Sequence, residues 1–279
     1  MPLSKTSESS TVLDERSKYL RREILGMLKA ARRGHLGSAF SLIEILRVLY
    51  DEVLQYDVSD PKWSGRDRFI LSKGHGCLAL YAILADKGFI SRSELKKFCS
   101  FEAMLGGHPN HKTPGVEFST GSLGHGLSIG IGCALHAKYE HAANRVYVVV
   151  GDGESNEGTI WEGALSAGKH QLDNLTVMID CNKYQSYGQT ENVQNLEPLA
   201  DKWRSFGFHV VEVDGHDVFA LKDACSELPK IKNKPSLVIC HTVKGRGIPF
   251  AESNPAWHHK SKISDVEMQT LFQGLANSR

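Results

Sequence analysis

Apolar residues along the chain fall into short runs and into longer stretches with helical spacing. The short, β-branched runs are typical of strands that are buried on both faces, and they lie at 68–72, 146–150, 175–180, 209–213 and 236–243. Apolar residues every three or four positions predict helices over 12–33, 42–54, 77–87, 91–100, 124–139, 159–170, 198–206, 218–228 and 264–275. Strands that alternate with helices predict an α/β fold, with a mostly parallel sheet and helices on both faces.

Two local patterns qualify this prediction. Ser41 and Glu44 have the spacing of a capping box, in which a serine begins a helix and a glutamate bonds back to it, so we expect Ser41 to cap the helix over 42–54. Residues 101–123 show little periodicity and many glycines and prolines. An irregular segment of that length inside a compact domain is usually functional.

The size and charge of the chain limit the classes of protein to which it can belong. With 279 residues, 41% of them apolar, it can bury a substantial core. We expect residues 1–11 to form a flexible polar tail and residues 12–279 to form a single domain. The 33 Lys and Arg nearly balance the 32 Asp and Glu, so we expect neither nucleic acid nor an anionic membrane as a partner. We expect no membrane span, because no apolar run approaches 18 residues. Six scattered cysteines indicate reduced thiols and a cytoplasmic protein.

The middle of the chain places two polar side chains at the ends of neighbouring strands. The run at 146–150 breaks at a Gly-Asp-Gly turn around Asp152, and the run at 175–180 leads to Asn182. Because one predicted helix joins the two runs, the strands should be parallel and should end at the same edge of the sheet. That edge is where open α/β sheets bind ligands. Carboxylate and amide oxygens there suit Mg²⁺ or Ca²⁺.

The Gly-Asp-Gly turn also has simpler interpretations. Taken alone, it is more often a plain turn that ends a strand. A dinucleotide fingerprint would require a third glycine where the chain has Asn156. An acid in such a loop would also repel a diphosphate unless a divalent cation lay between them. Asn182 on the next strand favours the cation. Only two side chains would then bind the cation. Its other ligands would be a backbone carbonyl, for which Tyr184 is the nearest candidate, diphosphate oxygens and water.

Six segments of the chain resemble motifs of one enzyme family. They are RGHLGSAFS at 33–41, SKGHGCLALY at 72–81, GGHPN at 106–110, TGSLGHGLSIGIG at 120–132, GDGESNEG at 151–158 and VKGRGIPFAESNPAWHHK at 243–260. In this order they are similar to the amino-terminal, diphosphate-binding part of the transketolase family, whose cofactor is thiamine diphosphate. The resemblance extends from about residue 12 over nearly the whole chain, and six motifs in order are far more specific than one.

The resemblance implies how the chain would bind the cofactor and its metal. Asp152, Asn182 and the carbonyl of Tyr184 would hold Mg²⁺, for which Ca²⁺ or Mn²⁺ can substitute. The backbone around Gly153 would approach the diphosphate. The other residues that match cofactor contacts of the family are Gly151, Glu154, His75, Lys244 and, along the aminopyrimidine ring, Gly121, Ser122 and Leu123.

The resemblance also assigns roles to the histidines. His35, His108 and His258 match catalytic histidines around the sugar hydroxyls, where imidazole suits proton transfer near neutral pH. His258 fits this role better than His259, because it directly follows Trp257 as in the family. The carbanion chemistry would belong to the cofactor, while the protein supplies orientation and electrostatics.

A second polypeptide is implied as well. In the family, the glutamate that activates the cofactor and the arginines that hold the sugar phosphate lie in a further domain without a counterpart in this sequence. We therefore expect one subunit of a split transketolase that transfers a two-carbon ketol unit from a ketose phosphate to an aldose. A C-terminal transketolase subunit would complete it in an α₂β₂ assembly. Glu157 and Glu162 match acids at the contact between cofactor sites.

Several questions stay open at this level. The α subunit of a thiamine-dependent 2-oxo acid dehydrogenase shares the GDG…N site and the split plan, although the sugar-facing histidines argue against it. A non-catalytic module for cofactor binding or interaction is a further alternative. The donor and acceptor sugars are not determined, because the phosphate-reading residues would lie in the partner. His125 stands where the family often has Gln, and its role is undetermined.

Overall fold

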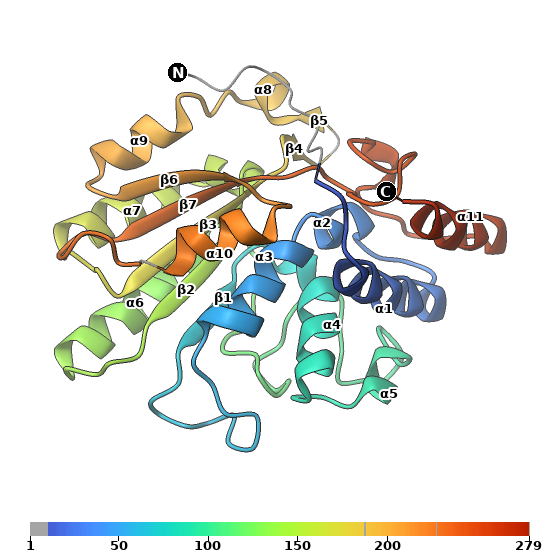
Figure 1. The fold of residues 1–279 in the computed structure, drawn as a ribbon, viewed down its shortest axis with the longest axis horizontal. Helices are drawn as coiled ribbons and strands as arrows, with labels where there is room; N and C mark the ends of the chain where they lie inside the picture. The colour runs from blue at the N-terminus through green and yellow to red at the C-terminus, as the bar shows by residue number, and fades with distance from the viewer. Residues whose placement is uncertain (1–10, 187, 227, 279) are drawn as a thin grey trace.

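Five parallel strands form the main sheet of the computed structural model, which describes residues 11–186, 188–226 and 228–278. The strands follow the spatial order β1-β2-β3-β7-β6 (Figure 1), and every neighbouring pair is parallel. Their bounds are Arg68–Leu71 for β1, Val146–Gly151 for β2, Leu175–Cys181 for β3, His209–Asp214 for β6 and Ser236–His241 for β7. The five predicted strands are therefore confirmed, as is the parallel α/β class.

Helices lie on both sides of the sheet. They are α1 (Glu15–Ala31), α2 (Leu36–Phe40), α3 (Ile43–Val48), α4 (Cys77–Lys87), α5 (Arg92–Leu95), α6 (His125–Tyr139), α7 (Gly158–Lys169), α8 (Thr190–Val193), α9 (Leu199–Ser205), α10 (Val218–Ser226) and α11 (Asp265–Ala276). Figure 1 shows α6, α7 and α9 toward the left of the view, whereas α1, α4 and α11 gather on the right.

The alternation of side chains along β2 divides the interior into two cores. Val148 and Val150 point to one face, where they pack with apolar residues of α6, α7 and α9. Tyr147 and Val149 point to the other face, toward a larger core that includes residues of α1, α3, α4 and α10. A strand that is apolar on both faces is expected only where helices cover both faces of a parallel sheet. Helices on both faces of the sheet therefore explain why the apolar run at 146–150 is unbroken.

The predicted capping box at Ser41 is wrong. The helix begins at Ile43 without a side-chain cap, and Ser41 Oγ donates instead to Asp180 Oδ2 at 2.6 Å. Glu44 Oε1 accepts from Arg21 Nη1 at 2.7 Å, and both side chains are almost fully buried. A buried carboxylate is strongly destabilising unless it is paired, so tertiary pairing overrides the local capping pattern.

Other predicted elements differ in their limits. The helix predicted over 42–54 changes after α3 into a π-helical turn at Leu49–Val53. Only α5 forms within the helix predicted over 91–100. Residues 101–123 contain neither helix nor strand, as predicted. A short antiparallel hairpin, β4 (Tyr184–Gln185) with β5 (Gly188–Gln189), was not predicted and begins two residues after Asn182.

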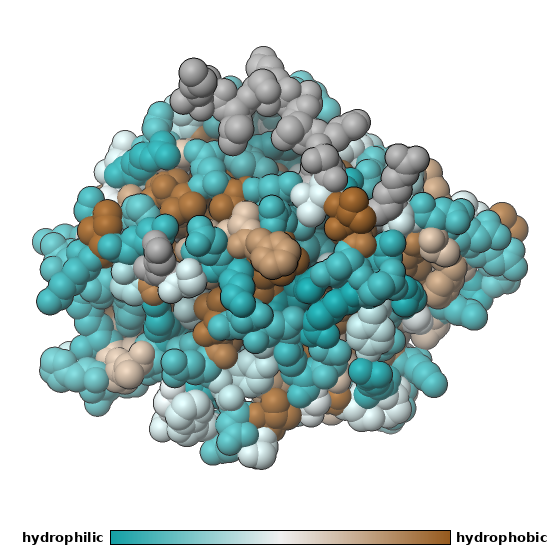
Figure 2. All heavy atoms as spheres, in the orientation of Figure 1, coloured by the Kyte–Doolittle hydropathy of each residue, from teal (hydrophilic) through white to brown (hydrophobic). Residues whose placement is uncertain are grey.

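Thr11 is the first residue that the structure describes. Residues 1–10 of the predicted tail lie outside the described residues, whereas Thr11 Oγ1 donates to Asp214 Oδ2 at 3.0 Å and so belongs to the fold. Hydrophilic residues dominate the face in Figure 2, where hydrophobic ones form small, separate groups. Within the described part of the chain, no helix has the length and apolar character that crossing a membrane requires.

Candidate active site

β2 and β3 deliver Asp152 and Asn182 to the same edge of the sheet. Each side chain lies one residue beyond the end of its strand. The backbone N–H of Asp152 donates to the carbonyl of Asp180 at 3.2 Å, and the N–H of Lys183 donates to Oδ2 of Asp152 at 2.6 Å. Asp152 is 2% exposed and Asn182 4%. The structure thus brings together the two side chains that the sequence predicts as metal ligands.

The oxygens of this pair suit a hard divalent cation. Asp152 Oδ1 accepts from the N–H of Gly153 at 2.8 Å, and Asn182 Oδ1 from the N–H of Tyr184 at 3.1 Å, so each retains lone-pair capacity. Burial, reinforced by Asp180, raises the pKa of Asp152 to about 6. A bound cation would therefore stabilise a carboxylate that is unfavourable to ionise. No group of three or more His, Cys, Asp and Glu side chains among the described residues could hold a metal, so two side chains, backbone and cofactor oxygens would have to suffice.

Lys244 adds a buried positive charge beside the predicted metal ligands. Its Nζ donates to the carbonyl of Tyr184 at 3.1 Å, and the side chain is 3% exposed. A carbonyl oxygen has two lone pairs, so this hydrogen bond is compatible with a cation on the same atom. Burial, together with the nearby Lys73, lowers the pKa of Lys244 to about 8. An anionic group such as a diphosphate would stabilise the charged form.

A buried ion pair that the sequence analysis missed lies next to the metal pair. Lys73 follows β1, Asp180 lies near the end of β3, and their charged groups are in contact. Their side chains are 1% and 0% exposed. Asp180 also accepts from the hydroxyls of Ser41 and Thr242 and from Nδ2 of Asn182 at 3.2 Å. The available signal was an aspartate inside an otherwise apolar strand, where burial requires partners.

Glu154 holds the turn after β2 in place. Its carboxylate accepts from Ser72 Oγ, from the N–H of Gly124 at 2.8 Å and from the N–H of Gly151 at 3.0 Å. The side chain is 2% exposed. These bonds join the loops that follow β1 and β2 to the start of α6. The sequence predicts Glu154 as a cofactor contact, and the structure shows its carboxylate engaged by three donors within the chain.

Five histidines gather in one cluster. The ring centroid of His35 lies 5.5 Å from that of His75, 5.7 Å from His258 and 6.3 Å from His108. His259, the weaker match for the catalytic role, has its ring centroid 4.5 Å from that of His35. The predicted catalytic histidines come from segments more than 200 residues apart in the chain, 35 to 258, and the fold brings them side by side.

Burial favours the neutral imidazole at four of these histidines by lowering the pKa. Burial, with the adjacent His259, lowers the pKa of His35 to about 4. Burial, with Lys244 next, lowers that of His258 to about 3. Burial also lowers the pKa of His108, and it lowers that of His75 well below its ordinary value. Neutral imidazole can both accept and donate a hydrogen bond, which is the state needed to exchange protons with a sugar hydroxyl.

Glycines allow the motifs to approach one another closely. Gly121 has φ +146°, and a Cβ on it would lie 2.9 Å from the ring of His108. A Cβ on Gly37 would lie 3.1 Å from Cγ of Lys244. The second contact joins the first motif of the chain to the last. In the middle of this assembly, Nδ1 of His258 is buried and has no hydrogen-bond partner among the described residues, so a bound hydroxyl would satisfy it.

The remaining predicted residues lie around this cluster. Ser122 is exposed, and Gly121 and Leu123 are partly buried, so the strip predicted for the aminopyrimidine ring is accessible. His125 is exposed at the start of α6, and its Nδ1 lies 3.0 Å from the carbonyl oxygen of Leu123. Both glutamates predicted for a subunit contact, Glu157 and Glu162, are exposed on α7 or at its start.

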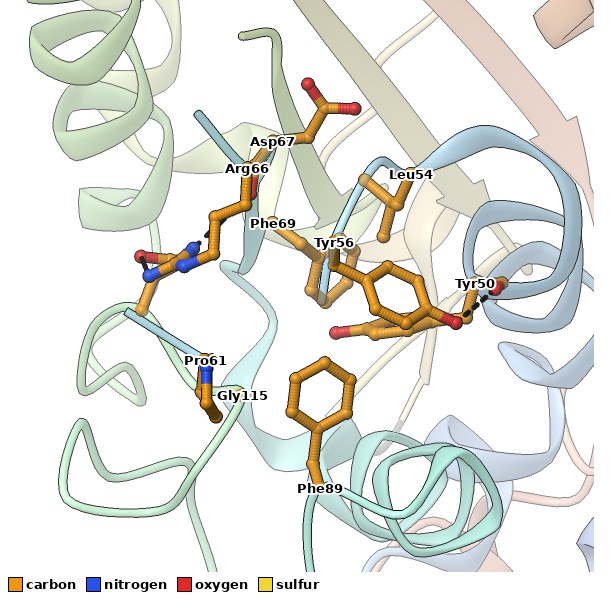
Figure 3. Close-up of a pocket in the computed structure, with 10 residues that line it drawn as sticks. Tyr50, Leu54, Tyr56, Pro61, Arg66, Asp67, Phe69, Phe89 and Gly115 are labelled. Atoms are coloured by element: carbon orange, nitrogen blue, oxygen red, sulfur yellow. Dashed lines mark hydrogen bonds and ion pairs between the residues drawn. The ribbon is translucent and has the colours of Figure 1, made fainter. Parts of the chain in front are cut away.

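A separate pocket is too small to bind a substrate. It has a volume of about 20 Å³, enough for one water molecule. Figure 3 shows aromatic rings on several of its sides, and its lining residues are Tyr50, Leu54, Tyr56, Pro61, Arg66, Asp67, Phe69, Phe89, Gly115 and Glu117. None of these is a predicted site residue, so the histidine and metal region is the better candidate for an active site.

Comparison with known proteins agrees with this geometry. The family model described as the transketolase, thiamine diphosphate binding domain matches residues 14–276. The chain therefore belongs to the transketolase family and corresponds to its thiamine diphosphate-binding domain. The prediction made from the six motifs is confirmed for the family, for the fold and for thiamine diphosphate as the cofactor.

Individual relatives refine this assignment. The chain is 40% identical over 247 residues to an apulose-4-phosphate transketolase subunit of Phocaeicola vulgatus, with 88% of each chain covered. It is 40% identical over 261 residues to a 6-deoxy-6-sulfo-D-fructose transketolase subunit of a Clostridium species, covering 93% of this chain and 95% of that one. The solved transketolase of Leishmania mexicana matches with a TM-score of 0.87 at 29% identity, and the chain spans 42% of its length.

Proposed function

We propose that this chain is the diphosphate- and metal-binding subunit of a split transketolase, which transfers a two-carbon ketol unit from a ketose phosphate to an aldose. The observation that carries the proposal is the meeting of two features at one sheet edge. Asp152 and Asn182 form a buried oxygen pair there, and the imidazoles of His35, His75 and His258 lie within 6 Å of one another.

Each group of residues has a task in this proposal. Asp152, Asn182 and the carbonyl of Tyr184 hold Mg²⁺, and Lys244 with the backbone near Gly153 faces the diphosphate. Bound thiamine diphosphate supplies the carbanion chemistry. The imidazoles of His35, His108 and His258 orient the sugar hydroxyls and accept or return their protons. Because Nδ1 of His258 lacks a partner among the described residues, we assign it a hydrogen bond to substrate.

The proposal includes a partner chain. It would be a C-terminal transketolase subunit that supplies the activating glutamate and the phosphate-binding arginines. The two relatives named as transketolase subunits match nearly their whole length to this chain, which supports a two-chain enzyme. We place Glu157 and Glu162 at the contact, in an α₂β₂ assembly located in the cytoplasm. Their exposure at α7 supports this placement.

Reconstitution tests the proposed function. The chain is assayed alone and with a chain that carries the remaining transketolase domains, in the presence of thiamine diphosphate and Mg²⁺. We expect ketol transfer from xylulose 5-phosphate only in the mixture. Full transfer by the chain alone would contradict the split enzyme. Decarboxylation of pyruvate in place of ketol transfer would favour a 2-oxo acid dehydrogenase, and cofactor binding without either activity would favour a non-catalytic module.

A further inference from the structure

Asp180 stands at the centre of a buried network that faces the metal pair. Its side chain is fully buried. Oδ2 accepts from Ser41 Oγ at 2.6 Å, from Asn182 Nδ2 at 3.2 Å and from Lys73 Nζ. Oδ1 accepts from Thr242 Oγ1. The donors come from the C-cap of α2, from the end of β3, and from the loops after β1 and β7, so the carboxylate joins four separate segments at the edge of the sheet.

The contact with Asn182 has a consequence for the orientation of its amide. A carboxylate can only accept, so Asp180 selects the NH₂ group of Asn182. The backbone N–H of Tyr184 can only donate, and it lies 3.1 Å from Oδ1 of the same amide. The two neighbours therefore fix both ends of the amide. The NH₂ group faces Asp180, and the oxygen faces the backbone that leads to Tyr184.

This orientation decides whether Asn182 can bind a cation. If the amide were turned over, its NH₂ group would point to the cation and repel it. The two orientations have the same shape and volume, so packing alone cannot distinguish them. Only hydrogen-bond partners of fixed polarity can do so, and Asp180 is the acceptor-only partner. The carboxylate also offsets the buried charge of Lys73.

We infer that Asp180 is a positioning residue of the metal site: it holds the NH₂ group of Asn182 and so presents the amide oxygen to the cation. Partners of metal ligands in the surrounding shell typically change metal affinity by about 10- to 100-fold. The inference rests on the proposed metal site. It assigns a function to a residue that is not itself a ligand.

A matched pair of variants separates amide orientation from charge. Removing Asp180 alone would leave Lys73 buried and unpaired, so both variants also carry Lys73→Met. Lys73→Met/Asp180→Leu removes every acceptor, whereas Lys73→Met/Asp180→Asn keeps one acceptor oxygen without the charge. Replacing a buried ion pair with apolar residues of similar volume is often neutral for stability, and circular dichroism would verify folding. If the leucine variant fails to fold, Lys73→Met/Asp180→Ala provides the same comparison.

The measurement is the affinity for Mn²⁺ in the presence of thiamine diphosphate, followed by electron paramagnetic resonance on the full chain. We expect the leucine variant to bind Mn²⁺ about 10- to 100-fold more weakly than the asparagine variant. Adding Asn182→Asp should raise the Mn²⁺ affinity of the leucine variant more than that of the asparagine variant, because a carboxylate has no donor face to misplace. A purely structural role of Asp180 would give equal gains in the two variants.

The outcomes are distinguishable. Equal affinities of the leucine and asparagine variants, or equal gains from Asn182→Asp in the two, would overturn the role of Asp180 while leaving the metal site intact. If the unsubstituted chain binds no Mn²⁺ under these conditions, the proposed metal site itself fails, and the role of Asp180 fails with it.

Discussion

The carboxylate of Asp152 accepts a hydrogen bond of 2.6 Å from the backbone N–H of Lys183, the residue that follows Asn182. This bond ties the loop after β2 to the loop after β3, next to both predicted metal ligands. The two predicted ligands are thus linked through the backbone as well as through the sheet, and each can be tested by substitution.

Substituting Asp152 with Asn should remove metal-dependent cofactor binding and should also remove the pH-dependent loss of stability that ionisation of this carboxyl causes in the metal-free chain. Burial raises the pKa of this carboxyl to about 6 from 3.8, so its ionised form is unfavourable in the folded state at pH 7.5. The difference between the two pKa values corresponds to a loss of at most roughly 3 kcal/mol in the free energy of unfolding. Because the folded pKa is raised, the penalty is absent below the unfolded pKa and grows as the pH rises to about 6. Urea denaturation in EDTA and calorimetric titration with thiamine diphosphate and Mg²⁺ would measure the two effects. Retained Mg²⁺-dependent binding would contradict the metal assignment.

Acid should destabilise the folded chain through His35. The unfolded imidazole takes up a proton near pH 6.5, but folded His35 does so only near pH 4. The unfolded state therefore binds more protons in this window, so stability rises with pH through it and is lost as the pH falls. We expect His35→Gln to reduce the stability loss between pH 7.5 and pH 5 by about 1–2 kcal/mol. Denaturation curves at both pH values would measure it.

His136→Gln is the control for this experiment, because His136 is exposed on α6. Its loss of stability in acid should match that of the unsubstituted chain. An equal loss in the His35 variant would show that burial does not suppress protonation of His35.

Substituting Glu154 with Gln should destabilise the chain although the two side chains have the same shape. Each carboxylate oxygen accepts from a different backbone N–H, one from Gly124 and one from Gly151. An amide would place its NH₂ group against one of these donors, which costs about 2–3 kcal/mol. The exposed Glu157→Gln is the control and should change the free energy of unfolding by less than about 0.5 kcal/mol. Similar changes in the free energy of unfolding for both variants would mean that the hydrogen bonds of Glu154 do not stabilise the chain.

Substituting Gly121 with Ala should impair the site by displacing His108. Gly121 has φ +146°, and the added Cβ would lie 2.9 Å from the imidazole ring. We expect a loss of about 1–3 kcal/mol in stability and a lower kcat/KM in the reconstituted enzyme. Gly26→Ala is a matched control in α1, where a Cβ would meet no atom within 4 Å. That variant should be more stable by about 0.5–1 kcal/mol.

The sequence predicts well what depends on strand pattern and chain order. The apolar runs define the strands, and parallel connection then brings Asp152 and Asn182 to one edge without further information. The histidines are predicted by resemblance of motifs. Their distances from one another follow only from the fold, because His35 and His258 lie at opposite ends of the chain. His259 joins the cluster for the same reason.

Buried polar pairs are what the sequence does not reveal. Glu44 has the spacing of a capping residue, yet it pairs with Arg21, 23 positions earlier. Lys73 and Asp180 are 107 positions apart, and no periodicity relates them. The energy that decides these contacts comes from burial of charge, which is a property of the completed fold. Local patterns therefore mislead where a charged residue becomes buried.

The register of β2 sets the position of the proposed metal ligand Asp152 as well as the packing of the two cores. Shifting β2 by one residue would turn Val148 and Val149 to the opposite faces of the sheet and so exchange the contents of the two cores. The same shift would move Asp152 by one strand position, about 3.3 Å, away from Asn182. A one-residue insertion in β2 cannot damage the metal site without also damaging the fold. Selection for a stable protein thereby preserves the spacing that the site needs, whereas the irregular segment at 101–123 is free of this constraint.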